Sequence, residues 1–459
     1  MISPPAHPTP SGRRRCAAAA GRAARALALA LAAVGCARGV PPLPDVPTAI
    51  AEWPPPARPA GCVEVAPTGA DLAGTLSRAR PGAAFCLAPG EYPGPLSLPE
   101  RVVLWGPRSA VIRGRADGTT VQVAAGAALL GLTVDGSGHR HDLEEAAVHV
   151  RGDRARIEGI AIRDALFGLI VERSAGVVVR GNLVSGAADV ALGLRGDGIR
   201  LWETHDSLVE GNRIVDCRDF VVWYSSDNRI VGNEVRRSRY GTHLMYSHGV
   251  ELAGNVYVGN VVGVFAMYSR RLTATGNLFA ASSGAAGIGL GVKESSDLAV
   301  ADNVFVRDAV GLYLDHSPFE PGSRNEFTGN ALRLCDVAVG FHSSDRANRF
   351  VRNSLRGNSL AVRVDGGGDA LANEWRENDF DDYQGYDLDR DGYGDLPYEL
   401  RRYSGALAAR HPELDFFRGA PALSLLDAVS WLAPLYRPQP VLVDARPWMG
   451  ASRGEALAN

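Results

Sequence analysis

Residues 211–277 read GNRIVDCRDFVVWYSSDNRIVGNEVRRSRYGTHLMYSHGVELAGNVYVGNVVGVFAMYSRRLTATGN and repeat one short phrase at nearly constant spacing. The phrase is a Gly-Asn pair that ends at Asn212, Asn233, Asn255 and Asn277, at steps of 21, 22 and 22 residues. Longer steps continue the series to Asn182, Asn303, Asn330 and Asn353. A Ser or Thr stands eight residues before most of these asparagines, at Ser174, Thr204, Ser225, Ser247, Ser269 and Ser295. Two columns in register indicate a structural repeat.

The segments between the two columns predict strands. They are short and rich in β-branched and aromatic residues, as in Val177–Val179 and Phe220–Trp223, and they show no helical period. A repeat of two helices needs roughly 33 residues or more, and the Leu-rich consensus of a horseshoe repeat is missing from the sequence. We therefore predict an all-β fold, a right-handed parallel β-helix, because crossovers between parallel strands are right-handed. Each Asn would lie in a tight turn that tolerates left-handed backbone, and its amide would bond to the Asn of the next coil.

The composition and the first residues indicate an exported protein. The chain is 46% hydrophobic and 22% charged with a net charge of −3, which gives no electrostatic case for nucleic-acid binding. Residues 1–36 have the pattern of a signal peptide, with arginines at 13–15 and an apolar run at 26–34 that is too short to span a bilayer. The run ends in Ala33-Val34-Gly35-Cys36, which resembles a lipobox and predicts a periplasmic chain lipidated at Cys36. An ordinary signal peptidase site nearby is the alternative.

Composition shifts divide the rest of the chain. We expect a Pro-rich linker over 37–60, an N-terminal cap with a short helix over 61–100, β-helix repeats over 101–380, an acidic loop over 381–398, and a tail over 399–459 with an amphipathic helix at 421–433. Cys62 and Cys86 bracket the cap and predict a disulfide in an oxidising periplasm. Cys217 and Cys335 stand among apolar residues and are predicted to be buried thiols.

Period two along the strands places an inward and an outward column just before the Ser/Thr column. The inward positions are uniformly apolar: Val171, Leu201, Val222, Leu244, Ala266 and Val292. The outward positions two before the Ser/Thr column are Glu172, Trp202, Trp223, Met245, Met267 and Lys293. The outward positions four residues before the Ser/Thr column are Ile170, Arg200, Val221, His243, Phe265 and Gly291. We expect Trp202, Trp223 and Phe265 to form an exposed aromatic face.

The methionines suggest a metal. The chain has four, and two of them, Met245 and Met267, occupy the same outward position of adjacent coils, with His243 two residues before Met245. Two thioethers and an imidazole are soft ligands that suit Cu(I). The alternative is that this face packs under a loop or a partner protein, because methionine is common at adaptable interfaces.

A second candidate metal site lies near the end of the predicted repeats. Asp387, Asp389, Asp391 and Asp395 stand at positions 1, 3, 5 and 9 of an EF-hand-type loop, with Gly392 at position 6. Position 12 is Tyr398, where a full EF-hand has Glu, so we expect a shortened structural calcium loop or a merely acidic turn.

Five stretches of the chain resemble the NosD family, and the resemblance runs from about residue 62 to about residue 447. The stretches are GIRLW at 198–202, RYGTHLMYS at 239–247, GVFAMYS at 263–269, YLDHSP at 313–318 and GYDLDRDGYGD at 385–395. The resemblance implies a periplasmic β-helix protein needed for maturation of nitrous oxide reductase, a copper enzyme. It also implies that the protein acts together with an inner-membrane ABC transporter permease. Nitrous oxide reductase or a copper chaperone is the further partner that the resemblance implies. Members of the family are not established as enzymes, and the lipobox departs from the plain secretory signal expected of them.

The rival prediction is a polysaccharide lyase, epimerase or glycan-binding protein, because many parallel β-helices act on glycans. Fold alone is only an analogy. A lyase would need acidic calcium ligands beside a basic residue, and a hydrolase would need two carboxylates about 5 to 9.5 Å apart. The outward face offers Lys293 and Asp315 one coil apart, without a carboxylate cluster in the adjacent sequence. Passive glycan binding along Trp202 and Trp223 stays open.

Overall fold

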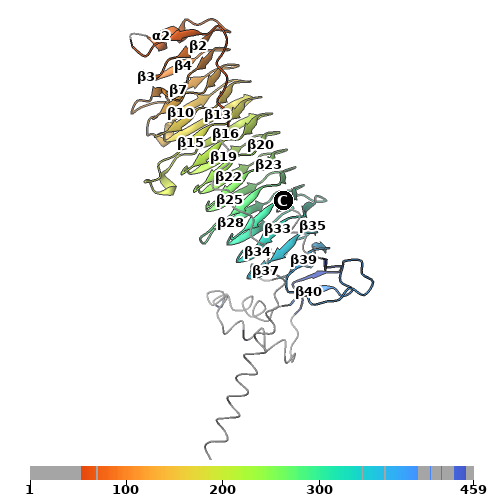
Figure 1. The fold of residues 1–459 in the computed structure, drawn as a ribbon. Coiled ribbons are helices and arrows are strands. Elements are labelled where there is room, and N and C mark those ends of the chain that lie inside the picture. Colours follow the sequence, from red (N-terminus) through yellow and green to blue (C-terminus); the bar gives the residue numbers. More distant parts are fainter. Residues whose placement is uncertain are drawn as a thin grey trace, which may run out of the picture. The chain divides into compact units, whose positions relative to one another are not determined.

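The computed structural model describes residues 53–68, 71–343, 345–365, 368–401, 414, 425 and 439–450, all within the compact unit Asp45–Asn459. In this part of the chain three parallel sheets of 14, 13 and 12 strands run side by side, and each complete coil contributes one strand to each sheet. Successive coils follow one another in chain order from the strands beside α2 to β39 (Figure 1). The prediction of an all-β parallel β-helix is confirmed. No helix among the described residues has the length and apolar character needed to cross a bilayer.

The strands of the three sheets have the following bounds. Sheet A contains β1 (Val63–Val65), β2 (Ala84–Leu87), β5 (Val103–Trp105), β8 (Ala128–Leu130), β11 (Arg156–Glu158), β14 (Val178–Arg180), β17 (Leu208–Glu210), β20 (Arg229–Val231), β23 (Glu251–Ala253), β26 (Thr273–Thr275), β29 (Ala299–Ala301), β32 (Asn325–Thr328), β35 (Asn348–Val351) and β38 (Glu374–Arg376). Sheet B contains β3 (Gly90–Pro93), β6 (Ala110–Arg113), β9 (Thr133–Asp135), β12 (Ala161–Arg163), β15 (Leu183–Ser185), β18 (Arg213–Val215), β21 (Glu234–Arg236), β24 (Val256–Val258), β27 (Leu278–Ala280), β30 (Val304–Val306), β33 (Ala331–Arg333), β36 (Ser354–Arg356) and β39 (Asp379–Phe380). Sheet C contains β4 (Leu96–Leu98), β7 (Val121–Val123), β10 (Ala146–Val150), β13 (Phe167–Ala175), β16 (Ile199–His205), β19 (Asp219–Trp223), β22 (Tyr240–Met245), β25 (Val262–Met267), β28 (Ile288–Lys293), β31 (Val310–Asp315), β34 (Val337–Phe341) and β37 (Leu360–Val364). The remaining elements are α2 (Leu72–Ser77), the 3-10 turns η1 (His141–Leu143) and η2 (Leu192–Leu194), and the antiparallel pair β40 (Tyr398–Leu400) and β41 (Leu442–Asp444).

The core lies between the three sheets, and each strand supplies it with alternate residues. The predicted inward column of sheet C is fully buried, from Val171 to Val292. Rings stack inside sheet B, where Tyr257 lies 5.2 Å from Phe279 and Phe279 lies 4.7 Å from Phe305. Because one coil repeats the next, identical side chains fall into register and pack as continuous ladders.

The asparagine ladder forms at the turn between sheets A and B. Asn212 Nδ2 donates to Asn233 Oδ1 at 2.9 Å, and Asn233 Nδ2 donates to Asn255 Oδ1 at 3.0 Å. The same contact continues to Asn378, which sequence reasoning missed, and there the Asp444 carboxylate takes the next position. The left-handed residue is the one before each Asn, as at Gly211 with φ 61°, and not the Asn itself. A serine ladder runs along the other predicted column, where Ser247 N donates to Ser269 Oγ at 3.2 Å.

Both ends of the stack are closed. At the N-terminal end α2 begins after Asp71, whose carboxylate accepts from Gly74 N at 2.8 Å, and a disulfide joins Cys62 to Cys86 with the Cα atoms 5.7 Å apart. At the C-terminal end β41 pairs with β40, and Asp444 binds Asn378 of the last coil. The helix expected at 421–433 lies outside the described residues except for Leu425.

The last residues of the Pro-rich linker lie on the turn glycines of the ladder. A Cβ added to Gly211 would lie 2.3 Å from the ring of Trp53, and one added to Gly159 would lie 2.4 Å from Pro56. The Trp105 indole also donates to Pro56 O at 3.0 Å. The same turn position at Gly232 has nothing within 4 Å. Bare glycine turns therefore form a track that the linker occupies over its first coils.

Candidate metal-binding face

Sheet C carries the predicted outward column in the predicted register. Trp202 pairs with Trp223, Trp223 with Met245, and Met245 with Met267. The pairing continues through Lys293 to Asp315. We call these residues the outward column: Trp202, Trp223, Met245, Met267, Lys293 and Asp315. The two methionine side chains therefore stand on neighbouring strands, which lie about 4.8 Å apart.

The aromatic face differs from the expectation because its members are half-buried, not exposed. The rings of Trp202 and Trp223 lie 5.7 Å apart, and Phe265 lies 6.2 Å from Tyr240. Each ring covers part of its neighbour, so the stacking that creates the face also removes much of it from solvent.

His243 is positioned by a β-bulge. Tyr240 pairs with Asp219 whereas His243 pairs with Val221, so β22 has one residue more than β19 between these two pairs. The extra residue brings the Tyr240 ring onto the imidazole, with centroids 4.6 Å apart. Trp223 closes the other side edge-on at 5.3 Å. Bulges re-aim side chains in this way beside functional sites.

The imidazole of His243 is neutral at neutral pH. Burial, helped by the positive charge of Arg239, lowers the pKa of His243 to about 4. A neutral imidazole keeps one nitrogen lone pair, which is the form that binds metal ions.

The donor set fits a soft metal ion. His243 Nε2 lies 3.5 Å from Met267 Sδ, and Met245 is the register partner of Met267. His243 Nδ1 and Trp223 Nε1 are buried and have no hydrogen-bond partner among the described residues. An indole N–H is only a donor, so Trp223 Nε1 is not a metal ligand, and the nitrogen of His243 that faces Met267 is Nε2. One imidazole and two thioethers form a set of ligands that Cu(I) accepts.

A buried ionic network fixes the strand starts beside His243. Asp197 accepts from Arg200 at 2.6 Å and from Arg218 at 2.9 Å, and Asp219 accepts from Arg239 Nε at 3.0 Å. Arg239 in turn lies over the Tyr240 ring at 5.0 Å. This network holds the Arg239 guanidinium, whose charge adds to the effect of burial in lowering the pKa of His243. It also buries Arg200, which period two had placed on the outer side of the strand.

Sequence reasoning missed a second aromatic column next to the first. Tyr224, Tyr246 and Tyr268 follow Trp223, Met245 and Met267, and their rings stack at 5.4 and 4.9 Å. All three have left-handed backbone, with φ of 51°, 49° and 52°. Glycine or asparagine would adopt this conformation at lower cost. The repeated phrases Trp-Tyr-Ser and Met-Tyr-Ser in the sequence were the signal for this column.

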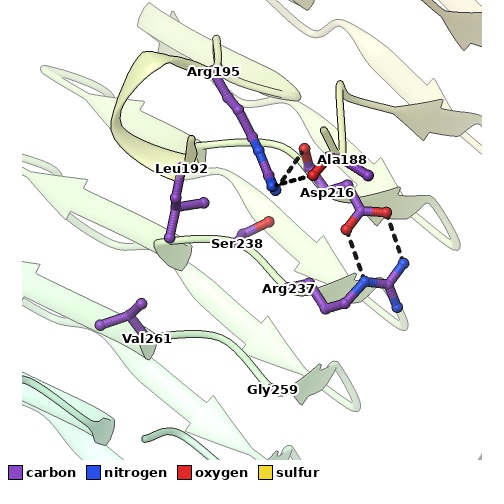
Figure 2. A pocket seen from close by; sticks show the side chains of 8 residues that line it. All are labelled: Ala188, Leu192, Arg195, Asp216, Arg237, Ser238, Gly259 and Val261. Carbon is purple, nitrogen blue, oxygen red and sulfur yellow. Dashed lines mark hydrogen bonds and ion pairs between the residues drawn. The ribbon is translucent and has the colours of Figure 1, made fainter. Parts of the chain in front are cut away.

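A cavity of about 430 Å³ lies at the turns between sheets B and C, under the loop that carries η2 (Figure 2). Its lining comprises Ala188, Leu192, Arg195, Asp216, Arg237, Ser238, Gly259 and Val261. Arg195 donates to the Ala188 carbonyl at 2.9 Å, and Arg237 makes two 2.7 Å bonds to Asp216. These charged groups are bonded to other residues of the cavity wall, so we assign no ligand or reaction to this cavity.

The acidic loop brings together three of its four predicted ligands. Carboxylate oxygens of Asp387, Asp389 and Asp391 lie within 4.8 Å of one another, whereas Asp395 is not in the group and accepts from Leu388 N at 2.7 Å. Arg446 donates to Asp391 at 2.7 Å. Calcium binding at this loop stays a prediction.

Two cysteines outside the disulfide lie in the core. Cys217 and Cys335 are buried thiols, and burial raises the pKa of Cys217 to about 12, so neither is a ready thiolate ligand. Cys36 lies outside the described residues.

Comparison with known proteins relates the chain to one family. A family model described as "Periplasmic copper-binding protein (NosD)" matches residues 185–385, which include the whole outward column. A protein of Pseudomonas aeruginosa described as a probable ABC transporter binding protein NosD is 29% identical over 394 residues, covering 80% of this chain and 88% of that protein. A protein of Stutzerimonas stutzeri with the same description is 26% identical over 416 residues, covering 79% and 86%.

Solved structures share the fold. The catalytic unit of an α-1,3-glucanase from Streptomyces thermodiastaticus aligns with a TM-score of 0.52 at 17% identity over 70% of each chain. The A-module of a mannuronan C-5 epimerase from Azotobacter vinelandii aligns with a TM-score of 0.50 at 15% identity, over 64% of this chain and 89% of that one. At these identities the likeness shows the fold alone.

The family model and both relatives agree with the resemblance seen in the five sequence stretches, and the relatives are described as binding proteins and not as enzymes. Residues 185–385 match the NosD family, whose model is described as periplasmic and copper-binding, and about four fifths of the chain is similar to the two NosD relatives.

Proposed function

We propose that this protein carries Cu(I) transiently on His243, Met245 and Met267 and assists maturation of nitrous oxide reductase together with an ABC transporter of the inner membrane. The observation that carries the proposal is the approach of His243 Nε2 to Met267 Sδ at 3.5 Å, within the region matched by the copper-binding family model. Copper is the cargo here. The resemblance to the NosD family supplies the reductase and the transporter as partners.

The chemistry of the face suits loading and release. Thioethers and a neutral imidazole bind Cu(I) without the thiolates that hold the ion most tightly. The site is open on one side because Met245 and Met267 are only half-buried. Aromatic rings of Trp223 and Tyr240 pack against the imidazole and hold it in place before any ion arrives. A lipid at Cys36 would keep the loaded protein near the transporter.

A Cu(I) titration under anaerobic conditions, against a competing chelator, tests the site. The Met245→Leu, Met267→Leu double variant conserves volume and should fold as wild type while losing most of its Cu(I) affinity. Met449→Leu is the matched control, because Met449 is also half-buried but lies outside sheet C. We expect the control to bind Cu(I) as wild type does.

The same variants test the role in cells. In a denitrifying strain that lacks its own copy, the double variant should fail to restore nitrous oxide reductase activity, and Met449→Leu should restore it. If the double variant binds Cu(I) normally but no longer binds the transporter, the face is a protein interface. If binding and maturation are both normal, the proposal is wrong.

A further inference from the structure

The outward column does not end at the methionines. Beyond Met267 it passes through Lys293 and Asp315, and the pairing of Leu314 with Phe341 places His342 next in line. His316 follows Asp315 directly, at the left-handed turn position with φ 47°. Two exposed histidines therefore come together on adjacent coils, 26 positions apart in the chain, with ring centroids 6.2 Å apart.

Each of these histidines has one ring nitrogen engaged. His316 Nδ1 lies 3.0 Å from Asp315 Oδ1, and His342 Nδ1 lies 3.2 Å from the Tyr313 hydroxyl. Neither Nε2 has a hydrogen-bond partner among the described residues. A histidine that binds a metal commonly has its second nitrogen bonded to a carboxylate or another polar group, which fixes the tautomer and the ring orientation. Both rings therefore have the arrangement of metal ligands.

The spacing and the surrounding charges suit one cation. A metal held at about 2.0–2.1 Å from each nitrogen can be shared by rings about 6 Å apart when their Nε2 edges face it. Both side chains lie on the surface, where a dissolved ion can reach them. Asp345 and Asp365 lie on the following coils, and with Asp315 they outnumber Lys293 and Arg363 in the surrounding sequence of the face. An excess of carboxylates favours a positive ion.

We propose that His316 and His342 form a second metal site, which binds a borderline divalent cation, Cu(II) or Zn(II), through their Nε2 atoms. Imidazole suits these ions, and the absence of thioethers separates this site from the soft Met site. Asp315 and Tyr313 are positioning residues. The inference goes beyond the proposed function and stands on its own geometry, so it holds whether or not Cu(I) binds at Met245 and Met267.

Titration of the tag-free, metal-free chain with Cu(II) in air, followed by electron paramagnetic resonance, tests the site. We expect a spectrum with coupling to imidazole nitrogen in wild type and its loss in both His316→Gln and His342→Gln. Tyr313→Phe keeps both ligands but removes an orienting partner, so affinity should fall by roughly tenfold while the imidazole signature remains. His139→Gln is the matched control, because it removes an exposed histidine away from this face.

The outcomes separate this site from the soft one. The Met245→Leu, Met267→Leu variant should retain Cu(II) binding, and His316→Gln should retain Cu(I) binding. A Zn(II) titration should show the same dependence on the two histidines, because Zn(II) favours imidazole over thioether. The proposal is overturned if His316→Gln and His342→Gln bind Cu(II) as wild type does, or if His139→Gln loses as much binding as they do.

Discussion

The Nε2 atom of His243 lies 3.5 Å from the Sδ atom of Met267, although the two residues are 24 positions apart in the chain. The contact exists because β22 and β25 pair in parallel: His243 pairs with Phe265, and Met267 lies two residues further along β25. The bulge in β22 sets the position of His243 relative to the preceding strand, β19.

Asp308 should make the protein less stable as pH rises from about 4 to about 7. Burial raises the pKa of Asp308 to about 7, so the folded chain binds this proton more tightly than the unfolded chain does. The stabilisation is complete below the ordinary aspartate pKa near 4, declines between about 4 and 7, and is gone above 7, a change of roughly 4 kcal/mol at most. Asp308→Asn should remove this part of the pH dependence, measured by denaturant unfolding at several pH values.

Asparagine suits position 308 because Asn260 already fills the equivalent turn position of another coil. Asn260 Oδ1 accepts from Ser238 N at 2.9 Å, just as Asp308 accepts from Ser282 N at 2.8 Å. Asp336→Asn, at an exposed carboxyl, controls for the lost charge. If Asp308→Asn and Asp336→Asn change the pH profile equally, the buried carboxyl is not the cause.

The asparagine ladder should be sensitive to single truncations. In Asn233→Ala the neighbours Asn212 and Asn255 lose buried hydrogen-bond partners, at roughly 1–3 kcal/mol for each unsatisfied group. Thr275→Ala, exposed on sheet A, should cost much less. Thermal melts of the two variants test this prediction. Equal melting temperatures would show that the asparagine hydrogen bonds do not stabilise the fold.

The contact of the linker with Gly211 should be measurable as a loss of stability when Gly211 is substituted. Gly211→Ala and Gly232→Ala meet the same backbone strain, because φ is 61° at both, which costs alanine about 1–2 kcal/mol. Only the first collides with Trp53, so it should destabilise the chain more. In a Trp53→Ala background the two substitutions should cost the same. A double-mutant cycle from unfolding measurements tests this, and equal costs in the wild-type background would show that the linker does not hold Trp53 there.

Calcium removal should loosen the C-terminal end if the acidic loop is occupied. Asp387, Asp389 and Asp391 supply carboxylates within 4.8 Å of one another, beside the segment that carries β41. We expect a chelator to lower the melting temperature of the wild-type chain and to leave Asp389→Ala unchanged. An Arg446→Gln variant should respond more strongly, because Arg446 competes for Asp391. No calcium in the purified protein and no effect of chelator would leave an acidic turn.

Periodicity made most of the fold predictable. The Asn and Ser columns fixed the coil length and therefore the register that puts Met245 beside Met267. The bulge before His243 was not predictable, because one added residue in a repeat looks like a loop insertion. The sequence also could not show that Asp444, 66 residues beyond Asn378, would end the ladder, because that contact depends on a return of the chain after a long segment.

The candidate site was predictable in its residues but not in its environment. Period two identified the outward methionines and His243, whereas the neutral state of His243 depends on Arg239 and on burial under neighbouring rings. The His316 and His342 pair escaped notice because the step between their coils is 27 residues (Leu314 to Phe341), against 22 for the preceding coil (Lys293 to Asp315), which hides their proximity in the chain. The spacing of residues within a strand predicts which side chains point outward. Contacts between coils of unequal length can be identified only from the structure.

X-ray absorption at the copper edge of the Cu(I)-loaded chain identifies the atoms that bind copper, and so tests whether His243, Met245 and Met267 are the ligands. We expect sulfur and nitrogen neighbours around copper in wild type and in Met449→Leu, no sulfur shell in the Met245→Leu, Met267→Leu variant, and no nitrogen shell in His243→Leu. A wild-type spectrum without sulfur neighbours, or a sulfur shell that survives loss of both methionines, would contradict the account.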